Sequence, residues 1–459
     1  RNNMNMSIIL AAGEGTRMKS DTPKILHKVC GKEMIKYIIE AAKDSGIEKN
    51  IVVLGYGKEK VENSIKSVDV ITVEQPIKKG DPYGTGFAVM AAQEYINDED
   101  TVIILCGDGP LIRKETLQEF MKYHDEKNCG VSVMTAYLDN PTGYGRVIRN
   151  NDSSIMNIVE EKEATEEIKK IKEINTGIYC FNGKLLKYSL GKIDTDNKKG
   201  EYYLTDTIRV LSSENYKIGG WAIQEPNDIK AVNDRAQLAE VTGIMQERIN
   251  KKHMMAGITM IDPKNTYIED SVIIGRDTLI YPGTILEGKT IIGSHCTIGP
   301  NTRIIDSTVR NYASIESSKV IEAEIGDETV VGPFAYLRPG TVLGKNVKIG
   351  DFVEVKKSSI GDNSKSSHLA YIGDAEVGKD VNIGCGVVFV NYDGKKKHRT
   401  TIGDGAFIGS NSNLVAPVNV SHGGYVACGS TITDDVEEGD LAIARSRQVN
   451  KKGLGKGRY

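Results

Sequence analysis

An aliphatic residue recurs at every sixth position through much of the second half of the chain. A spacing of six fits neither the 3.6-residue turn of a helix nor the alternation of a simple strand. It fits a coil with three flat faces, in which each face contributes one inward aliphatic residue and each corner favours glycine. The three unbroken series are Ile274, Ile280, Leu286, Ile292, Ile298 and Ile304; Ile325, Val331, Leu337, Leu343, Ile349 and Val355; and Ile402, Ile408, Leu414, Val420, Val426 and Ile432.

This period is typical of hexapeptide repeats, which stack into a parallel β-helix. We therefore predict a left-handed parallel β-helix over about 257–440. The six-residue register is interrupted at 356–371 and at 390–401. Because extra residues must leave a stacked coil, we expect both segments to form loops, and loops on a rigid scaffold often carry functional groups.

The first half of the chain alternates short apolar segments with helix-like ones. Such alternation is typical of βαβ units around a mostly parallel sheet. We predict a Rossmann-like α/β domain with a mostly parallel sheet, whose ligands bind beyond the carboxyl ends of its strands. The expected strands are 7–13, 50–57, 69–75, 101–108 and 130–138.

A charged, regularly patterned segment at 228–252 predicts a long helix between the two halves. The expected organisation is an α/β domain at 7–235, a helical linker at 236–256 and a β-helix domain at 257–459.

Charge and composition exclude whole classes of protein. The 59 Lys+Arg and 62 Asp+Glu residues nearly cancel, which argues against a globally basic nucleic-acid-binding protein. No stretch approaches eighteen apolar residues, so we expect no contact with a membrane interior. The seven cysteines are scattered and form no CxxC pair, which favours reduced thiols in the cytoplasm.

A glycine-rich segment, LAAGEGTRM at 10–18, follows the first expected strand. Gly13 and Gly15 would let backbone amides approach phosphate oxygens closely. Arg17 adds a guanidinium that can bond two oxygens at once, and Lys24 supplies a second positive charge. The same residues also fit an ordinary glycine turn with surface cations.

Asp108 ends the expected strand at 101–108. A carboxylate at the carboxyl end of a parallel strand is well placed for a hard cation such as Mg²⁺. The alternative is a turn-forming aspartate before Gly109 and Pro110.

His368 is distinguished from the other histidines because it lies in an interruption of the six-residue register. Imidazole suits general-base chemistry since it titrates near neutral pH. Arg338 and Lys356 lie nearby in the sequence as partners for a phosphate, and Asn391 and Tyr392 begin the second interruption. A histidine in a solvent loop is otherwise only polar surface.

The motifs LAAGEGTRM, PK, GTG, CGDGPL, PTGYGR, IVEEK, NTGIY and VNDR occur in this order, followed by SSHLAY and NYDG. Together they resemble bacterial bifunctional N-acetylglucosamine-1-phosphate uridylyltransferases/glucosamine-1-phosphate N-acetyltransferases, over essentially the whole chain. The resemblance implies that the β-helix acetylates glucosamine-1-phosphate with acetyl-CoA. The α/β domain would then transfer UMP from UTP to N-acetylglucosamine-1-phosphate and release pyrophosphate. It further implies Mg²⁺, a cytoplasmic homotrimer, and a role in supplying cell-wall and lipopolysaccharide precursors.

In the α/β domain, the resemblance makes Arg17 and Lys24 catalytic cations that face the phosphates, and Asp108 and Asn233 the ligands of Mg²⁺. Transfer of this kind needs mainly positioning and charge neutralisation from the protein. The nucleotide- and sugar-binding residues that it implies are Leu10, Ala11, Ala12, Gly13, Lys24, Gln75, Gly84, Thr85, Cys106, Gly107, Asp108, Gly143, Glu160, Asn175 and Asn233.

In the β-helix, the resemblance makes His368 the base that deprotonates the amino group of glucosamine-1-phosphate for attack on the thioester. Glu354 would hold the amine or the histidine. The sugar-phosphate residues that it implies are Arg338, Lys356, Tyr371 and Asn382, and the acetyl-CoA residues are Cys385, Asn391, Tyr392, Ser410, Cys428 and Arg445.

The chain departs from the family's pattern in two places. The segment from Gln75 to Gly84 is longer than usual, with Tyr83 in place of leucine and Phe87 in place of histidine, so we expect the uracil loop to differ in shape. Cysteine replaces alanine at two acetyl-CoA positions; because a thiol is only slightly larger, we expect binding to survive.

Two other functions remain to be weighed. Other sugar-1-phosphate nucleotidyltransferases carry a non-catalytic β-helix, but they typically begin with GGxGTR and lack the SSHLAY and NYDG segments. Subunits of a translation nucleotide-exchange factor share the two-domain architecture as scaffolds, but they would not need Lys24, Asp108, Asn233 and His368 together.

Two chance patterns are set aside. The segment 283–290 matches a P-loop, yet its leucine belongs to the six-residue register, so we expect a β-helix corner there. A β-helix carbonic anhydrase would need a closely spaced histidine pair for zinc, and the sequence has none.

Overall fold

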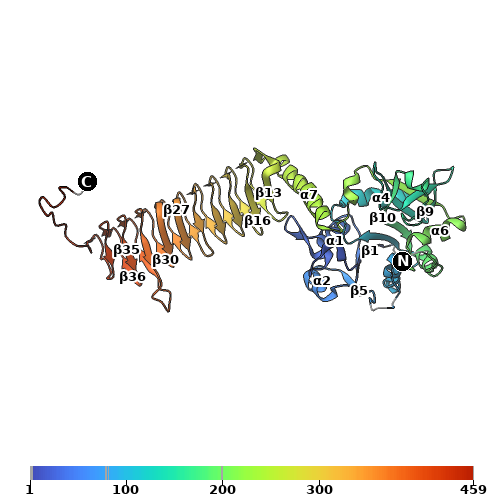
Figure 1. Ribbon diagram of the computed structural model, residues 1–459, viewed down its shortest axis with the longest axis horizontal. Coiled ribbons are helices and arrows are strands. Elements are labelled where there is room, and N and C mark those ends of the chain that lie inside the picture. The colour runs from blue at the N-terminus through green and yellow to red at the C-terminus, as the bar shows by residue number, and fades with distance from the viewer. Residues whose placement is uncertain (1–3, 78–79, 81, 198–199, 458–459) are drawn as a thin grey trace. The chain divides into compact units, whose positions relative to one another are not determined.

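The computed structural model describes residues 4–77, 80, 82–197 and 200–457. The chain divides into two compact units, and the division falls between Met245 and Gln246, within helix α7 (Arg235–Met255). Figure 1 shows the first unit as an α/β fold and the second as a stack of flat coils.

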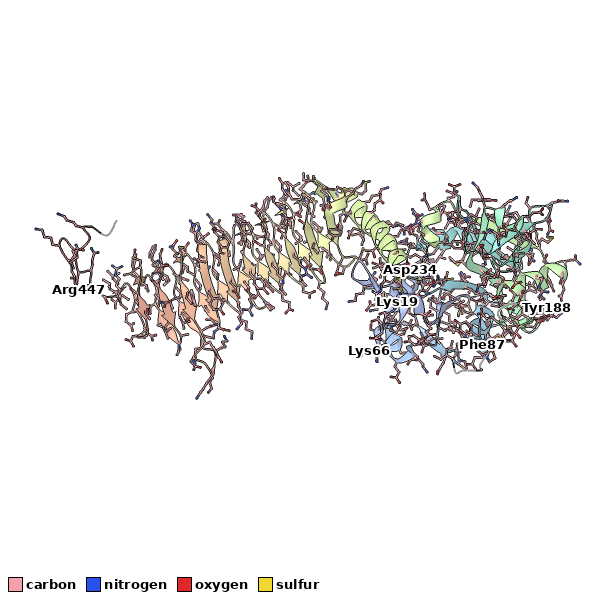
Figure 2. The ribbon with its side chains drawn as sticks, in the orientation of Figure 1. Lys19, Lys66, Phe87, Tyr188, Asp234 and Arg447 are labelled. Carbon is pink, nitrogen blue, oxygen red and sulfur yellow. The ribbon has the colours of Figure 1, made fainter. Side chains whose placement is uncertain are left out.

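The expected long helix is present, but it begins at Arg235 rather than at 228. The Asp234 side chain accepts a hydrogen bond from the Gln237 amide (2.8 Å), and the Gln237 side chain accepts one from the Asn233 amide (2.8 Å). This reciprocal arrangement satisfies amides that lack a partner inside the helix, and so it sets the start. Asp234 is labelled at this position in Figure 2.

A mixed sheet forms the centre of the first unit, in the order β11-β7-β10-β6-β1-β4-β5. All five expected strands are present, and β1 lies parallel to β4 and β6. The strands are β1 (Asn5–Ala11), β4 (Lys49–Leu54), β5 (Ile71–Glu74), β6 (Thr101–Cys106), β7 (Val131–Tyr137), β10 (Glu173–Asn182) and β11 (Ile218–Ala222), with β8 (Arg146–Arg149) and β9 (Ile155–Val159) paired at one side.

Strand β10 was not predicted, and it runs antiparallel to both β6 and β7. Its pairing with β7 shifts register between Asn175 and Tyr179, where the NTGIY motif interrupts the regular strand. The predicted α/β class is confirmed, with an antiparallel strand in an otherwise largely parallel centre.

Apolar side chains are buried on both faces of this sheet, as in other sheets covered by helices. Ile9, Val52 and Ile103 pack with α1 and α4, whereas Ile8 and Ile51 pack with α3, α5 and α6 on the other face. The helices are α1 (Met34–Asp44), α2 (Lys58–Ile65), α3 (Thr85–Met90), α4 (Lys114–Lys127), α5 (Gly183–Leu190) and α6 (Thr205–Ser213).

The second unit is a parallel β-helix, whose strands β12 to β39 lie between Thr259 and Ala442. Every member of the three aliphatic series is buried. Successive coils pair in parallel and in register, so that Ile325 lies beside Leu343 and Leu343 beside Ile360. The six-residue period is therefore confirmed as the inward row of each face.

The expected loop at 356–371 is wrong. Two nine-residue strands, β27 (Lys348–Lys356) and β29 (Lys365–Gly373), pair along this region. The six-residue period did not predict these strands for two reasons. The spacing between the inward residues Val355 and Ile360 is five, and the next inward position, beside Ile349, is occupied by the polar Ser366.

The expected loop at 390–401 is confirmed, since it leaves the coil between β32 (Val388–Val390) and β33 (Thr400–Ile402). The P-loop-like segment 283–290 contains β16 (Thr284–Glu287) and no helix, as predicted. Among the described residues, no helix combines the length and the apolar character needed to cross a membrane.

The end of α7 closes the first coil of the β-helix. The buried Asn250 side chain donates hydrogen bonds to the Pro263 carbonyl (2.8 Å) and the Thr266 carbonyl (3.0 Å). Gln246 donates to Asn250 (2.9 Å) and accepts from the Ile268 amide (3.2 Å). These bonds satisfy polar backbone groups that would otherwise form an open edge.

The inward rows predict how the β-helix responds to a cavity. We expect Ile349→Ala to destabilise the second unit by about 2–5 kcal/mol, because the site is fully buried and cannot collapse. The urea midpoint followed by far-UV circular dichroism should fall. Fluorescence of Trp221, the single tryptophan, reports on the first unit and should keep its midpoint. Lys348→Ala, on the outer face of the same strand, is the control; an equal loss there would contradict the inward-row account.

Candidate functional site

A cavity of about 420 Å³ opens at the carboxyl ends of the strands in the first unit. Leu10 and Cys106 pair there across β1 and β6, and the Gly107 amide donates to the Leu10 carbonyl (2.8 Å). The predicted nucleotide-site residues that line the cavity are Leu10, Ala11, Ala12, Gly13, Lys24, Gln75, Gly84, Thr85, Cys106 and Asp108.

One wall of this cavity comes from a segment that the sequence did not indicate. Residues 200–204 pair with the start of α3, since Tyr202 donates to the Tyr83 carbonyl (2.8 Å) and accepts from the Gly86 amide (2.8 Å). Gly84 has a φ of 118°, and a Cβ there would collide with the Tyr202 backbone. The pairing brings Glu201 into the cavity lining beside Tyr83. No local periodicity predicts such a long-range pairing.

The structure places the two unusual residues of the predicted uracil loop. Tyr83 lines the cavity, whereas the Phe87 ring stacks on Tyr202 with centroids 6.2 Å apart. Figure 2 labels Phe87. Residues 78–79 and 81 of the longer loop lie outside the described residues.

Lys24, Asp108 and Asn233 converge at one point of the cavity. The Lys24 ammonium lies 2.6 Å from Asp108 Oδ2 and donates to Asn233 Oδ1 at 3.2 Å. Two oxygens from distant parts of the chain thus face a single positive charge. Carboxylate and amide oxygens are suitable ligands for Mg²⁺, so this donor set fits the metal.

Cys106 is not a nucleophile in this cavity. Burial raises the pKa of its thiol to about 12, so the thiol stays protonated at neutral pH. Its Sγ donates to the Gly177 carbonyl (3.6 Å), which makes it part of the wall.

The residues predicted to hold the sugar lie together only in part. A Cβ on Gly145 would lie 3.7 Å from both Glu160 and Asn175, so these two side chains flank the same point. Thr205, which the sequence did not suggest, donates to Glu160 (3.1 Å). Gly143 lies two residues away in an exposed turn.

Arg17 is exposed in a short helical turn at Thr16–Met18 and does not line the cavity. Of the two cations predicted to face the phosphates, Lys24 lies beside Asp108 and Arg17 does not.

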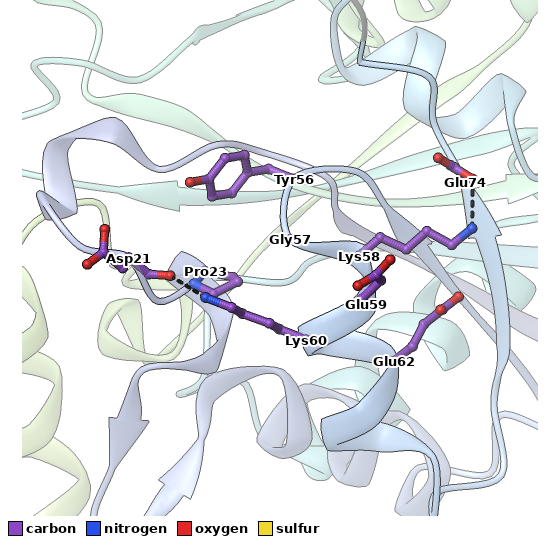
Figure 3. A pocket seen from close by; sticks show the side chains of 9 residues that line it. All are labelled: Asp21, Pro23, Tyr56, Gly57, Lys58, Glu59, Lys60, Glu62 and Glu74. Carbon is purple, nitrogen blue, oxygen red and sulfur yellow. Dashed lines mark hydrogen bonds and ion pairs between the residues drawn. The ribbon is translucent and has the colours of Figure 1, made fainter.

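A second cavity, of about 720 Å³, lies near the start of α2 (Figure 3). Its lining holds more carboxylates than cations, and Lys58 is already paired with Glu74 (2.7 Å) while Lys60 donates to the Asp21 carbonyl (2.8 Å). This balance disfavours phosphate, so the larger cavity is not the nucleotide site.

In the β-helix, the predicted acetyltransferase residues form a row across successive coils. Asp351 pairs with His368, and the register of the next coils places Cys385, Ser410 and Cys428 in line. Backbone hydrogen bonds join these corners, and Arg445 donates to the Cys428 carbonyl (2.7 Å). The sequence identified His368, Cys385, Ser410 and Cys428 but neither Asp351 nor the alignment of the row.

A second cluster lies around Asp374, a buried carboxylate that the sequence did not suggest. Asn391 donates to Asp374 (2.6 Å) and to the Tyr371 hydroxyl (3.2 Å), and Lys356 donates to the same carboxylate (3.3 Å). One carboxylate therefore holds predicted sugar-phosphate and acetyl-CoA residues together.

The remaining predicted residues lie at the edges of these clusters. Glu354 pairs with Arg338 (2.8 Å), so it does not hold His368. Asn382 lies in β31 (Asn382–Ile383), and the Tyr392 hydroxyl donates to the Gly394 carbonyl (2.7 Å) at the start of the confirmed loop.

Comparison with known proteins decides the family. The nucleotidyl transferase family model matches residues 6–222, and a GMPPB C-terminal domain model matches 268–360, ending before His368. A bifunctional protein GlmU from Alkaliphilus metalliredigens is 55% identical over 447 residues, 97% of either chain. Those of Clostridioides difficile and a Geobacillus species are 53% and 51% identical, over 97% of this chain and 96% of theirs.

The chain belongs to the bifunctional GlmU family. Like its GlmU relatives, it is a transferase with two activities, glucosamine-1-phosphate N-acetyltransferase and N-acetylglucosamine-1-phosphate uridylyltransferase. The two reactions make UDP-N-acetylglucosamine, a precursor of peptidoglycan and the cell wall.

The Asp374 cluster of this GlmU chain predicts the effect of a single added methyl group. A Cβ on Gly373 would lie 2.5 Å from both Asn391 Nδ2 and the Tyr371 hydroxyl, so Gly373→Ala must displace both side chains. We expect acetyl-transfer kcat/KM to fall by about 10- to 100-fold, because small displacements of positioning groups are costly. Uridylyl transfer by the same preparation should be unchanged.

Gly243→Ala in α7 is the matched control, since a Cβ there meets nothing within 4 Å. It should leave both activities unchanged. Full acetyl transfer by Gly373→Ala would contradict the arrangement of the Asp374 cluster.

Proposed function

We propose that uridylyl transfer takes place in the cavity of the α/β unit and acetyl transfer along the β-helix row. The assigned domains are 7–235 for uridylyl transfer, 236–256 for the linker and 257–459 for acetyl transfer. The convergence of Lys24, Asp108 and Asn233 inside a cavity lined by the predicted nucleotide residues carries the first assignment. The alignment of His368 with Cys385 and Ser410 carries the second.

In the uridylyl site, a phosphate oxygen of N-acetylglucosamine-1-phosphate attacks the α-phosphorus of UTP, and pyrophosphate leaves. Asp108 and Asn233 would hold Mg²⁺, which would neutralise phosphate charge. Lys24 lies where it can leave Asp108 and pair with a phosphate. Arg17 is the second cation proposed for the phosphates, although it lies in an exposed turn outside the cavity lining. Glu160 and Asn175 hold the sugar.

In the acetyl site, Nε2 of His368 accepts a proton from the amino group of glucosamine-1-phosphate. The nitrogen attacks the thioester carbonyl, the C–S bond breaks, and the proton passes to the sulfur of CoA. Arg338 and Lys356 bind the sugar phosphate, with Tyr371 and Asn382 on the sugar. Acetyl-CoA lies along the row formed by Cys385, Asn391, Tyr392, Ser410, Cys428 and Arg445.

The acetyl site requires neighbouring copies of the chain, which we propose form a homotrimer. The His368 side chain is 64% exposed, so one β-helix alone does not enclose a substrate. Beside it lies a row of exposed apolar corners, Phe334 (60%), Phe352 (60%) and Leu369 (57%). Such a row favours burial against another chain. We also propose that the protein acts in the cytoplasm, because its substrates UTP and acetyl-CoA are anionic metabolites of that compartment.

Single substitutions should separate the two reactions. We expect His368→Ala to lower acetyl-transfer kcat by about 10²- to 10⁴-fold, the usual contribution of a general base, without changing uridylyl transfer. Asp108→Asn should do the reverse, with a loss of about 10²-fold or more and a higher Mg²⁺ requirement, because a charged ligand is removed.

His422→Ala, at another exposed histidine of the β-helix, is the control and should retain both activities. Both reactions are followed on the same full-length preparations by separating the sugar nucleotides and sugar phosphates. If either variant lost both activities with its fold intact, the two-site assignment would be wrong.

A further inference from the structure

His368 has a hydrogen-bonded partner to which the sequence assigned no role. Its Nδ1 lies 3.0 Å from Oδ1 of Asp351, which occupies the same position on the preceding coil. Strands β27 and β29 pair directly through these two residues, so the contact is set by the coil register. The sequence motifs did not predict this hydrogen bond. Glu354, which was expected to hold the amine or His368, instead accepts a hydrogen bond from Arg338.

The chemistry of this contact has one consistent form. A carboxylate can only accept a hydrogen bond, so the shared proton lies on Nδ1 of His368. The lone pair of the neutral ring is then on Nε2, which points to the other side of the imidazole. The hydrogen bond from His368 lowers the pKa of the Asp351 carboxyl below its usual value, which keeps it ionised at neutral pH.

The other titratable groups around His368 do not offer the same interaction. Strand β27 also contributes Lys348, which lies beside Lys365 at the start of the pairing. Its other titratable side chains are Glu354, which is paired with Arg338, and Lys356, which bonds Asp374. Strand β29 contributes Tyr371, whose hydroxyl accepts from Asn391, and Lys365 at its start. The next coil places the Cys385 thiol in line, and β32 (Val388–Val390) has no titratable side chain.

We propose that Asp351 is a positioning residue for acetyl transfer: it holds the His368 ring and fixes the tautomer whose Nε2 accepts the proton of the amine. The inference rests on the proposed function, in which His368 is the base. Asp351 does not touch the substrate, so it acts through the histidine. The carboxylate also stabilises the imidazolium that forms as the proton is taken.

This role differs from a structural one, because the Asp351 side chain is 40% exposed and its removal leaves no buried polar group unpaired. Asp351→Asn has the same shape as the native residue but no charge. Its side-chain amide can also donate to Nδ1 and favour the unproductive tautomer.

The test compares Asp351→Asn and Asp351→Glu with the wild type in full-length protein. We expect Asp351→Asn to lower acetyl-transfer kcat by about 10- to 100-fold, part of the ~10²–10⁴ supplied by a general base, with little change in either KM. The loss should fall on kcat rather than on KM, since Asp351 acts through the histidine and does not touch the substrate. Asp351→Glu should recover most of kcat.

Asp380→Asn is the matched control. Asp380 is another exposed carboxylate on a coil corner, and it accepts a single side-chain hydrogen bond, from Asn363 (3.1 Å). It should leave kcat unchanged, and uridylyl transfer should be constant in every variant.

The outcomes are distinct. If His368→Ala abolishes acetyl transfer while Asp351→Asn matches the wild type in kcat, the inference is overturned and the proposed function stands. If His368→Ala retains acetyl transfer, the assignment of the base fails, and the role of Asp351 fails with it. Loss of kcat at nearly constant KM, rescued by Asp351→Glu, supports the inference.

Discussion

The stacking of inward aliphatic residues from coil to coil is the constraint on which the proposed acetyl site depends. Ile349, Ser366 and Ile383 occupy one inward row. The residues two positions later therefore line up in a second row, at the surface of the coil: Asp351, His368 and Cys385. Apolar burial thus fixes the spacing of polar groups that share no local sequence. A one-residue slip in a coil would move His368 away from its partner while each strand kept its composition.

The α/β unit positions its groups by a different route. Parallel strands end at one edge, so Leu10 and Asp108 meet there although they are distant in sequence. Lys24 and Asn233 reach the same point from segments outside those strands, and the ammonium now lies between two oxygens suited to a metal. Positioning and charge neutralisation, which uridylyl transfer requires, both follow from that edge.

The sequence was most informative where structure repeats. Every residue of the three aliphatic series is buried, as predicted. The strand ends pointed to Gly13 and Asp108, and the family resemblance added Leu10, Ala11 and Ala12; all five line the cavity. The sequence wrongly predicted a loop at 356–371, because Ser366 replaces an aliphatic residue there and one coil is a residue shorter. Glu201, Asp374 and Asp351 were missed because pairings with segments far along the chain place them. The exposed Arg17 shows that a motif residue can lie apart from its site.

We propose that one chain carries two chemically distinct sites that act in sequence. The most direct measurement is a mass-spectrometric end-point assay with glucosamine-1-phosphate, acetyl-CoA, UTP and Mg²⁺, in which each reagent is omitted in turn. The account predicts UDP-N-acetylglucosamine only in the complete mixture, and accumulation of N-acetylglucosamine-1-phosphate when UTP is omitted. Acetylated sugar phosphate beside untouched UTP in the complete mixture would contradict it.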